Sequence, residues 1–197
     1  MIDLPEYPSP NGAEAALIDF GAFLTPALGG PVQRINRLGN RHRINVSMPT
    51  MQNDKYGRAW VNSLKRGKTE GARMEWPLLG FKPGNPGTVL VNGADQAGTT
   101  LIVDGATANY AFRVDQPFSI ETDGQHFLYF VAEETVADGS GNATLTITPA
   151  LRRSPTNNDV CHFAKPMVEG FIHGNEMIWQ MQLGNLLGIA FELHESE

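Results

Sequence analysis

Two short stretches of the sequence hold residue types that could bind phosphate or calcium. Gly67-Lys68-Thr69 is like the end of a P-loop, but a P-loop needs a glycine five residues before Gly67, where Asn62 stands inside a predicted helix. Asp138-Gly-Ser140-Gly-Asn142 starts with calcium-loop spacing, but it lacks a glycine at the sixth position and has Pro149 at the twelfth, where an acid is needed. A helix end and a turn between strands account for these stretches better.

Catalytic and metal-binding residues do not gather in the sequence. No ligand spacing such as H-x-x-x-H occurs among the five histidines, which are His42, His126, His162, His173 and His194. Cys161 and His162 are neighbours, so in a strand they point to opposite faces and cannot form a nucleophile–base pair; Glu133 and Glu134 face apart for the same reason. We predict no enzyme activity, no catalytic residue, no metal site and no cofactor, although distant strands could still bring two carboxylates together.

A cluster of arginines lies in "PVQRINRLGNRHRINVSMP", from Pro31 to Pro49. The formal net charge of −6 argues against a general nucleic-acid binder, and few aromatic residues lie between the arginines to stack on bases. From Gln33 to Lys82, however, eleven Lys and Arg stand against three Asp and Glu, a local balance of +8, which leaves −14 for the rest. This separation of charge suits contacts within the fold or between subunits, and a solvated face is the alternative.

Short alternating runs predict the strands that position these residues. The chain has 21 Gly and 13 Pro, which separate the runs in a way typical of an all-β protein. Residues 44–48 alternate between apolar and polar, so Arg41 and Arg43 share the polar face. We expect residues 33–37 to pair with this strand around Gly39-Asn40, and residues 177–183 to form a second hairpin with 187–193 around Gly184-Asn185.

One helix is predicted among the strands, from Asp54 to Arg66. Its apolar residues have helical spacing and its polar residues lie opposite them. Gly67 suits the C-terminal stop of this helix, since glycine accepts the left-handed conformation there.

A change of texture at "GFKPGNPG" (Gly80 to Gly87) predicts a domain boundary. Short Thr- and Val-rich strands with acidic turns follow it, and the last hairpin resumes the earlier pattern. We predict that residues 1–83 and 166–197 form one β-sheet domain and that residues 84–165 form an inserted small β-barrel.

The N-terminus "MIDLPEYPSP" is acidic and broken by prolines, unlike a signal peptide. No apolar run approaches the roughly 18 residues that span a bilayer. The single Cys161 cannot form a disulfide within one chain. We expect a protein made in a cytoplasm, without a membrane partner.

Several runs, taken together, resemble distal tail (baseplate) proteins of tailed phages and prophages. They are "GGPVQRINRLGNRHRINVSMPTM", "LKRGKTEGARMEWPLLGF", "GTVLVNGADQAGTTLIVDG", "ATLTITPALRRSP" and "PMVEGFIHGNEMIWQMQLGNLLGIAFELHE". The resemblance covers nearly the whole chain in order and texture. It implies a β-sandwich of the tail-tube type with one flanking α-helix and an inserted small β-barrel.

The resemblance also implies a function. Such a protein forms a ring, commonly a hexamer, at the tail tip of the virion, where it joins the tail tube protein to the baseplate hub protein while DNA only passes through the lumen. Two alternatives are a carbohydrate-binding baseplate module and a tail-tube or tail-completion protein. In the first alternative, the sugar would stack on aromatic residues of the insertion, namely Tyr110, Phe112, Phe127, Tyr129 and Phe130.

A ring gives the cationic segment a use, since one side of each subunit must complement the next. We therefore predict that its basic residues lie at contacts between subunits. The candidates are Arg34, Arg37, Arg41, Arg43, Arg58, Lys65 and Arg66.

Overall fold

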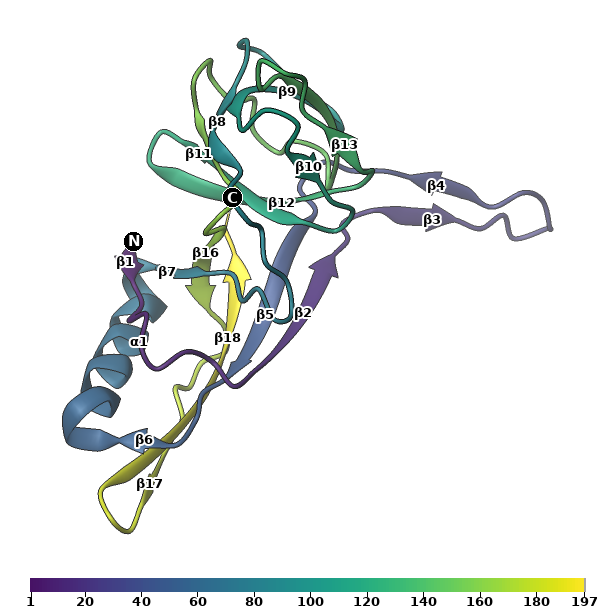
Figure 1. Cartoon of the computed structure of the whole chain (residues 1–197). Helices are drawn as coiled ribbons and strands as arrows, with labels where there is room; N and C mark the ends of the chain where they lie inside the picture. The colour runs from purple at the N-terminus through teal and green to yellow at the C-terminus, as the bar shows by residue number, and fades with distance from the viewer. Residues whose placement is uncertain (197) are drawn as a thin grey trace.

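A computed structural model describes residues 1–196, which form a β-sheet with a helix against one face and a closed β-barrel at one end (Figure 1). The fold class predicted from the sequence is confirmed: the described chain is mainly β, with one α-helix and a small barrel.

The sheet has eight strands in the order β1-β7-β16-β18-β5-β2, with β17 and β6 pairing with the first part of β18. The strands are β1 (Ile2–Asp3), β2 (Gly12–Ile18), β5 (Arg41–Ser47), β6 (Met51–Gln52), β7 (Ala72–Glu75), β16 (Met167–Ile172), β17 (Trp179–Gln182) and β18 (Leu186–Glu195). Burial alternates along β5 and β18, so one face of the sheet is apolar and the other polar. The predicted faces of residues 44–48 are therefore confirmed.

Helix α1 (Arg58–Glu70), preceded by a π-helical turn at Asn53–Gly57, covers the apolar face of the sheet. Its buried side chains include Trp60 and Leu64, and burying a large apolar side chain contributes roughly 1.5–3 kcal/mol. The helix ends at Glu70, followed by Gly71 with a φ of 79°, and the predicted end at Gly67 is wrong. Gly67 serves close packing, because a Cβ there would lie 2.9 Å from the Cβ of Ala72.

The barrel closes in the order β11-β12-β14-β9-β8-β15. Its strands are β8 (Gly87–Val91), β9 (Thr100–Ala106), β11 (Pro117–Thr122), β12 (Gln125–Val131), β14 (Ala143–Thr148) and β15 (Val160–His162), and the pair β10 (Ala111–Phe112) and β13 (Thr135–Val136) lies beside them. Phe118 and Phe163 stack in its interior with ring centroids 4.4 Å apart. All six strands fall within residues 84–165; that this segment folds as a separate domain stays a prediction.

The first predicted hairpin is wrong and the second is confirmed. Strand β4 (Gln33–Ile35) pairs with β3 (Ala22–Leu24), while β5 pairs with β2 and β18. Residues 19–40, which include β3 and β4, leave the sheet together as one projecting segment. The Asn40 side chain accepts a hydrogen bond from the Phe20 N–H (3.0 Å), and this bond joins the two ends of the segment. In the second hairpin, β17 and β18 pair around Gly184-Asn185.

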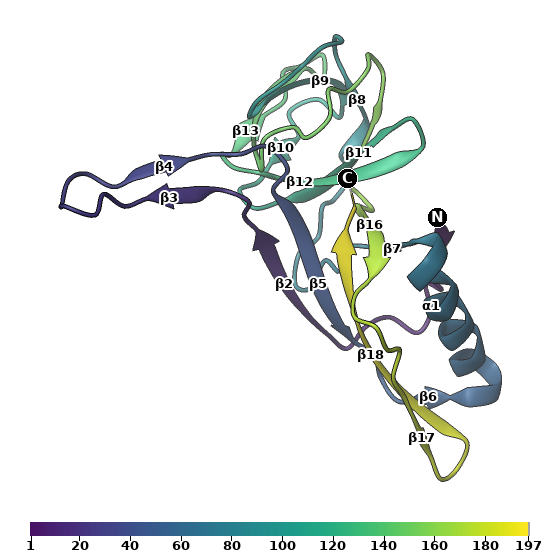
Figure 2. The same ribbon diagram turned by 180° about the vertical axis from the view of Figure 1, so that it is seen from behind.

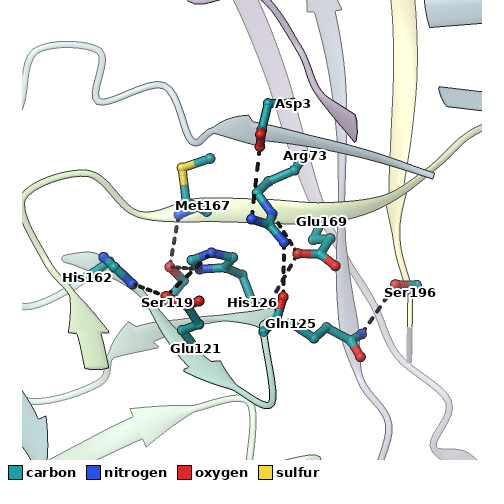
Figure 3. Close-up of polar contacts among 11 residues, drawn as sticks. Asp3, Arg73, Ser119, Glu121, Gln125, His126, His162, Met167, Glu169 and Ser196 are labelled. Carbon is teal, nitrogen blue, oxygen red and sulfur yellow. Dashed lines mark hydrogen bonds and ion pairs between the residues drawn. The ribbon is translucent and has the colours of Figure 1, made fainter. Parts of the chain in front are cut away.

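Barrel and sheet meet along a seam, which we define as the contact of β12 with β16 and β18 together with Arg73 and Arg152. Figure 3 shows the part of the seam around Arg73 and Glu169. Strand β12 pairs with β11 along its length but with β14 only from Phe130 onward, so the preceding N–H groups that face away from β11 need other acceptors. Glu169 accepts the N–H of His126 at 3.2 Å, and Glu195 accepts the N–H of Leu128 at 2.8 Å. Leu128 itself packs in the core of the sheet.

Both seam carboxylates are buried and paired. Glu169 lies 2.8 Å from the guanidinium of Arg73. Glu195, whose side chain is fully buried, pairs with Arg152 and also accepts the backbone N–H of His42 at 2.9 Å. Burial alone would raise the pKa of Glu195, but the hydrogen bond from His42 and the charge of Arg152 outweigh it and hold the pKa below its usual value.

Candidate interface between subunits

The feature that most suits contact with another chain is the arm, which we define as residues 19–40. It contains the β3–β4 hairpin and projects away from both the sheet and the barrel (Figures 1 and 2). Seven of its large apolar side chains are exposed by 39–101%, namely Phe20, Phe23, Leu24, Leu28, Val32, Ile35 and Leu38. A two-stranded hairpin is only marginally stable alone in water. A large exposed apolar surface on such a hairpin therefore indicates a binding surface for a partner.

The base of the arm has a defined geometry. Arg34 pairs with Asp19 at 2.6 Å, and its guanidinium lies 5.2 Å from the ring centroid of Phe23. The guanidinium of Arg41 lies 4.9 Å from the ring centroid of Phe20. The hydrogen bond from the Gly21 N–H, and next to it the one from Arg34, lower the pKa of Asp19. These contacts fix the direction in which the arm leaves the sheet.

The edge of the sheet next to the arm is also uncovered. Strand β2 is the last strand on this side and pairs only with β5. Three residues of β2 lie on the apolar face of the sheet but are exposed, namely Ala13, Ala15 and Leu17. Leu17 is 48% exposed. An open edge strand offers unpaired backbone groups, so this edge and the arm form one candidate interface.

Arg43 lies on the polar face of the sheet and already has a partner within the chain. Its Nη1 lies 2.6 Å from Oε1 of Glu192, and the same oxygen lies 2.9 Å from Nε2 of His194. The hydrogen bond from Arg43, followed by that from His194, lowers the pKa of Glu192. The charge of Arg43 is therefore largely balanced inside one subunit.

The predicted residues on the helix lie away from the arm. Arg66 pairs with Glu70 one turn later at 2.6 Å, and the Lys65 ammonium lies 4.5 Å from the ring centroid of Trp179. Arg58 is exposed near the β17–β18 hairpin, whose side chains Met181 and Leu183 are 78% and 99% exposed. This end of the molecule is a second, smaller apolar surface.

The structure thus divides the seven predicted interface residues among three places. Arg34 and Arg37 lie on the arm and Arg41 directly at its base; Arg43 lies on the polar face, and Arg58, Lys65 and Arg66 lie on α1. It does not bring them together into one surface, and their role at contacts between subunits stays a prediction.

Sequence reasoning missed the apolar residues of the arm. Their density around the Gly29-Gly30-Pro31 turn was a usable signal, because turns are normally polar.

The aromatic residues considered for stacking on sugar are packed instead. Phe112, Phe127 and Tyr129 are buried in the barrel, with at most 4% exposure. Tyr110 packs against the same core and Phe130 against the core of the sheet. Three of the five rings are therefore buried, and the other two are partly buried against a core.

The nucleophile considered from the sequence is also buried. Cys161 points into the barrel core with 3% exposure, while His162 lies on the outer face, as their alternation predicts. Burial raises the pKa of the Cys161 thiol far above its ordinary value, which disfavours the reactive thiolate.

Two clusters of possible metal ligands were not predicted: Glu121 with His126 and His162, and His173 with Glu192 and His194. The first cluster draws on three strands, and the second joins His173, just after β16, to two residues of β18, so neither lies within one segment of the sequence. One local signal existed, since the Asp123-Gly124 turn places Glu121 directly opposite His126.

A comparison with known proteins finds no family model and no curated protein that matches this sequence. Among residues 1–196, no helix combines the length and apolar character needed to cross a membrane. Function is therefore inferred from the residues and their geometry.

Proposed function

We propose that this chain is a structural subunit of a phage or prophage tail, a distal tail protein that assembles into a ring between the tail tube and the baseplate hub. The observation that carries the proposal is the arm, a projecting hairpin with seven exposed large apolar side chains beside an open sheet edge. Contact with another chain would bury these side chains, which are exposed in a single subunit. The sheet, helix and barrel agree with the plan that the sequence resemblance implies.

Contact between an arm and a different surface of the next subunit is heterologous, and such contacts close into rings or extend into filaments. A ring of six is the form that the resemblance implies. A filament without fixed length would instead favour the tail-tube alternative. The buried aromatic residues of the barrel give the carbohydrate-binding alternative no support from those side chains.

The test is the mass of the purified assembly, measured by light scattering, in the wild-type chain and in an arm variant. Replacing Phe23 and Leu28 with serine should reduce the assembly to monomers that keep the wild-type circular dichroism, because both side chains are largely exposed within one chain. The matched control is a double serine replacement of Val114 and Val136, two apolar residues of the barrel region that are 59% and 55% exposed.

The wild-type chain should have six times the mass of one 21.5 kDa chain, and the control should match it. A wild-type chain that is monomeric at all concentrations would overturn the ring. Equal loss of assembly in the control would show that the arm has no special role.

A further inference from the structure

The residues Glu121, His126 and His162 converge on the outer face of the barrel beside the seam (Figure 3). Glu121 stands on β11 opposite His126 on β12, and His162 on β15 stands opposite Ser119, two residues before Glu121. Strand geometry places all four side chains on one face, away from the barrel core. Three separate strands thus contribute to one small cluster.

The hairpin between β11 and β12 explains why Glu121 and His126 lie so close. Asp123 and Gly124, with φ of 51° and 77°, form a two-residue turn that sets Thr122 opposite Gln125. The next pair, Glu121 and His126, is then one whose backbones do not bond to each other, and side chains approach most closely at such pairs. The His126 N–H accordingly bonds to Glu169 across the seam.

The distances suit a tetrahedral metal ion. Oε2 of Glu121 lies 3.0 Å from Nε2 of His162 and 4.0 Å from Nε2 of His126, and all three possible ligand atoms lie within 4.8 Å of one another. Ligands bound at roughly 2.1 Å to a tetrahedral ion stand about 3.4 Å apart. The two rings have centroids 5.0 Å apart and planes tilted by 51°, so they are not stacked on each other. Small side-chain rotations are enough to form the site.

The surroundings hold His126 in the state that a metal needs. Ser119 Oγ accepts the N–H of Met167 at 3.0 Å and lies 3.3 Å from Nδ1 of His126, where it can accept the ring proton and leave Nε2 free. Arg73 does not compete for Glu121, because it pairs with Glu169 and Asp3.

A Ser-His-Glu catalytic triad would use the same residues, but its nucleophile would be unreachable. Ser119 is completely buried and its oxygen is already engaged with the N–H of Met167. By contrast, the side chains of Glu121 and His162 are 38% and 31% exposed, which leaves one side of the cluster open to water. The geometry fits three protein ligands and a water molecule better than a nucleophile.

We propose that Glu121, His126 and His162 bind a Zn²⁺ ion, with water in the remaining position. Two imidazoles and one carboxylate are a common ligand set for zinc, and this cluster supplies it without a thiolate. The ion ties the β11–β12 hairpin to β15, the last barrel strand before the chain returns to the sheet. It stabilises the barrel next to the seam, whether or not the chain forms a ring.

The second cluster has the same composition but the wrong geometry, which makes it an internal control. The rings of His173 and His194 stack with centroids 4.0 Å apart and planes 8° from parallel, so their lone pairs run side by side and do not converge. Glu192 is also engaged by the Arg43 guanidinium, a cation that opposes a metal ion. We expect no zinc at this cluster.

The test uses the full chain after treatment with a chelator, titrated with zinc chloride by calorimetry. The wild-type chain should bind one equivalent and melt at a higher temperature with zinc. Loss of a supporting partner typically costs about 10- to 100-fold in affinity, so His162→Ala, which removes a ligand, should cost at least about 100-fold. The matched control His173→Ala should bind as the wild type does.

Binding of Co²⁺ in place of zinc should give the intense visible absorption of a four- or five-coordinate ion, and this signal should disappear in His162→Ala. Glu121→Gln, at a partly exposed position, provides a second loss of a ligand if His162→Ala fails to fold. No zinc binding by the wild-type chain, undiminished affinity in both ligand variants, or a loss in His173→Ala would overturn the proposal.

Discussion

The seam and the arm use the same kinds of residue in opposite ways. In the seam, the side chains of Arg152 and Glu195 are 4% and 0% exposed, and the carboxylate also accepts two backbone N–H groups. In the arm, Arg34 and Asp19 form a similar pair with 42% and 37% exposure. The seam pairs its buried charges within one chain, although Nε and Nη1 of Arg152 have no hydrogen-bond partner there, whereas the arm leaves its apolar groups uncovered. The first region holds one subunit together, and the second suits contact with another.

The two ion pairs should therefore differ greatly in what they contribute. An exposed pair adds about 0–1 kcal/mol, because water and salt screen it. A buried pair adds little net stability as a pair, but removing one partner strands the other charge, which costs about 3–5 kcal/mol. The same chemical contact is nearly dispensable in the arm and essential in the seam.

The largest expected effect is that of Glu195→Ala. The change leaves the guanidinium of Arg152 buried without its carboxylate and two backbone N–H groups without an acceptor. We expect the free energy of unfolding to fall by about 3–5 kcal/mol, measured by urea unfolding at one fixed protein concentration. Asp19→Ala in the arm should lower it far less, because water screens this exposed pair. Equal losses in the two variants would remove the distinction between the regions.

A second prediction uses acid to separate the regions. The pKa of His126 is lowered to about 4 in the folded chain from 6.5 in the unfolded one, so from pH 6.5 down to about 4 only the unfolded chain takes up this proton. Stability is therefore lost as the pH falls through this window. In chelator, His126→Gln should flatten the pH dependence by up to about 1.4 kcal/mol per pH unit, measured by urea unfolding from pH 7 to 5.

The matched control for this pH effect is Asp19→Asn in the arm. The fold lowers the pKa of the Asp19 carboxyl below its ordinary value of 3.8, so this group titrates below the window and the change should leave the slope between pH 7 and 5 as in the wild type. An unchanged slope in His126→Gln would mean that the seam does not keep this ring neutral.

Local patterns in the sequence correctly predicted the fold class, the faces of β5 and the hairpin at Gly184-Asn185. They depend on alternation and turn residues, which act over a few positions. The end of α1 was predicted wrongly at Gly67, because a glycine that stops a helix and one that lets a helix approach a sheet look alike in sequence. Only the contact with Ala72 distinguishes them.

The contacts that define the seam and the proposed zinc site lie beyond local patterns. Arg152 and Glu195 are 43 residues apart, and His162 reaches Glu121 only because the barrel closes between β15 and β11. Before strand order and register are known, every arginine and every histidine is equivalent. This is why the arginines were grouped as one interface, although the structure places Arg43 in a pair with Glu192.

The smallest expected effects concern that grouping. Arg37 is exposed at the base of the arm, beside a hollow that it shares with Pro149, while Arg43 is paired on the polar face. Since the arm is the proposed contact, Arg37→Ala should weaken assembly a few-fold, and more strongly at low salt than at high salt, because salt screens an exposed charge. Arg43→Ala should leave both the free energy of unfolding and assembly close to those of the wild type, because water screens its pair with Glu192. Sedimentation of both variants at two salt concentrations measures the difference.

If Arg43→Ala weakens assembly as much as Arg37→Ala does, the polar face of the sheet also contacts the next subunit. The interface is then wider than the arm and the β2 edge.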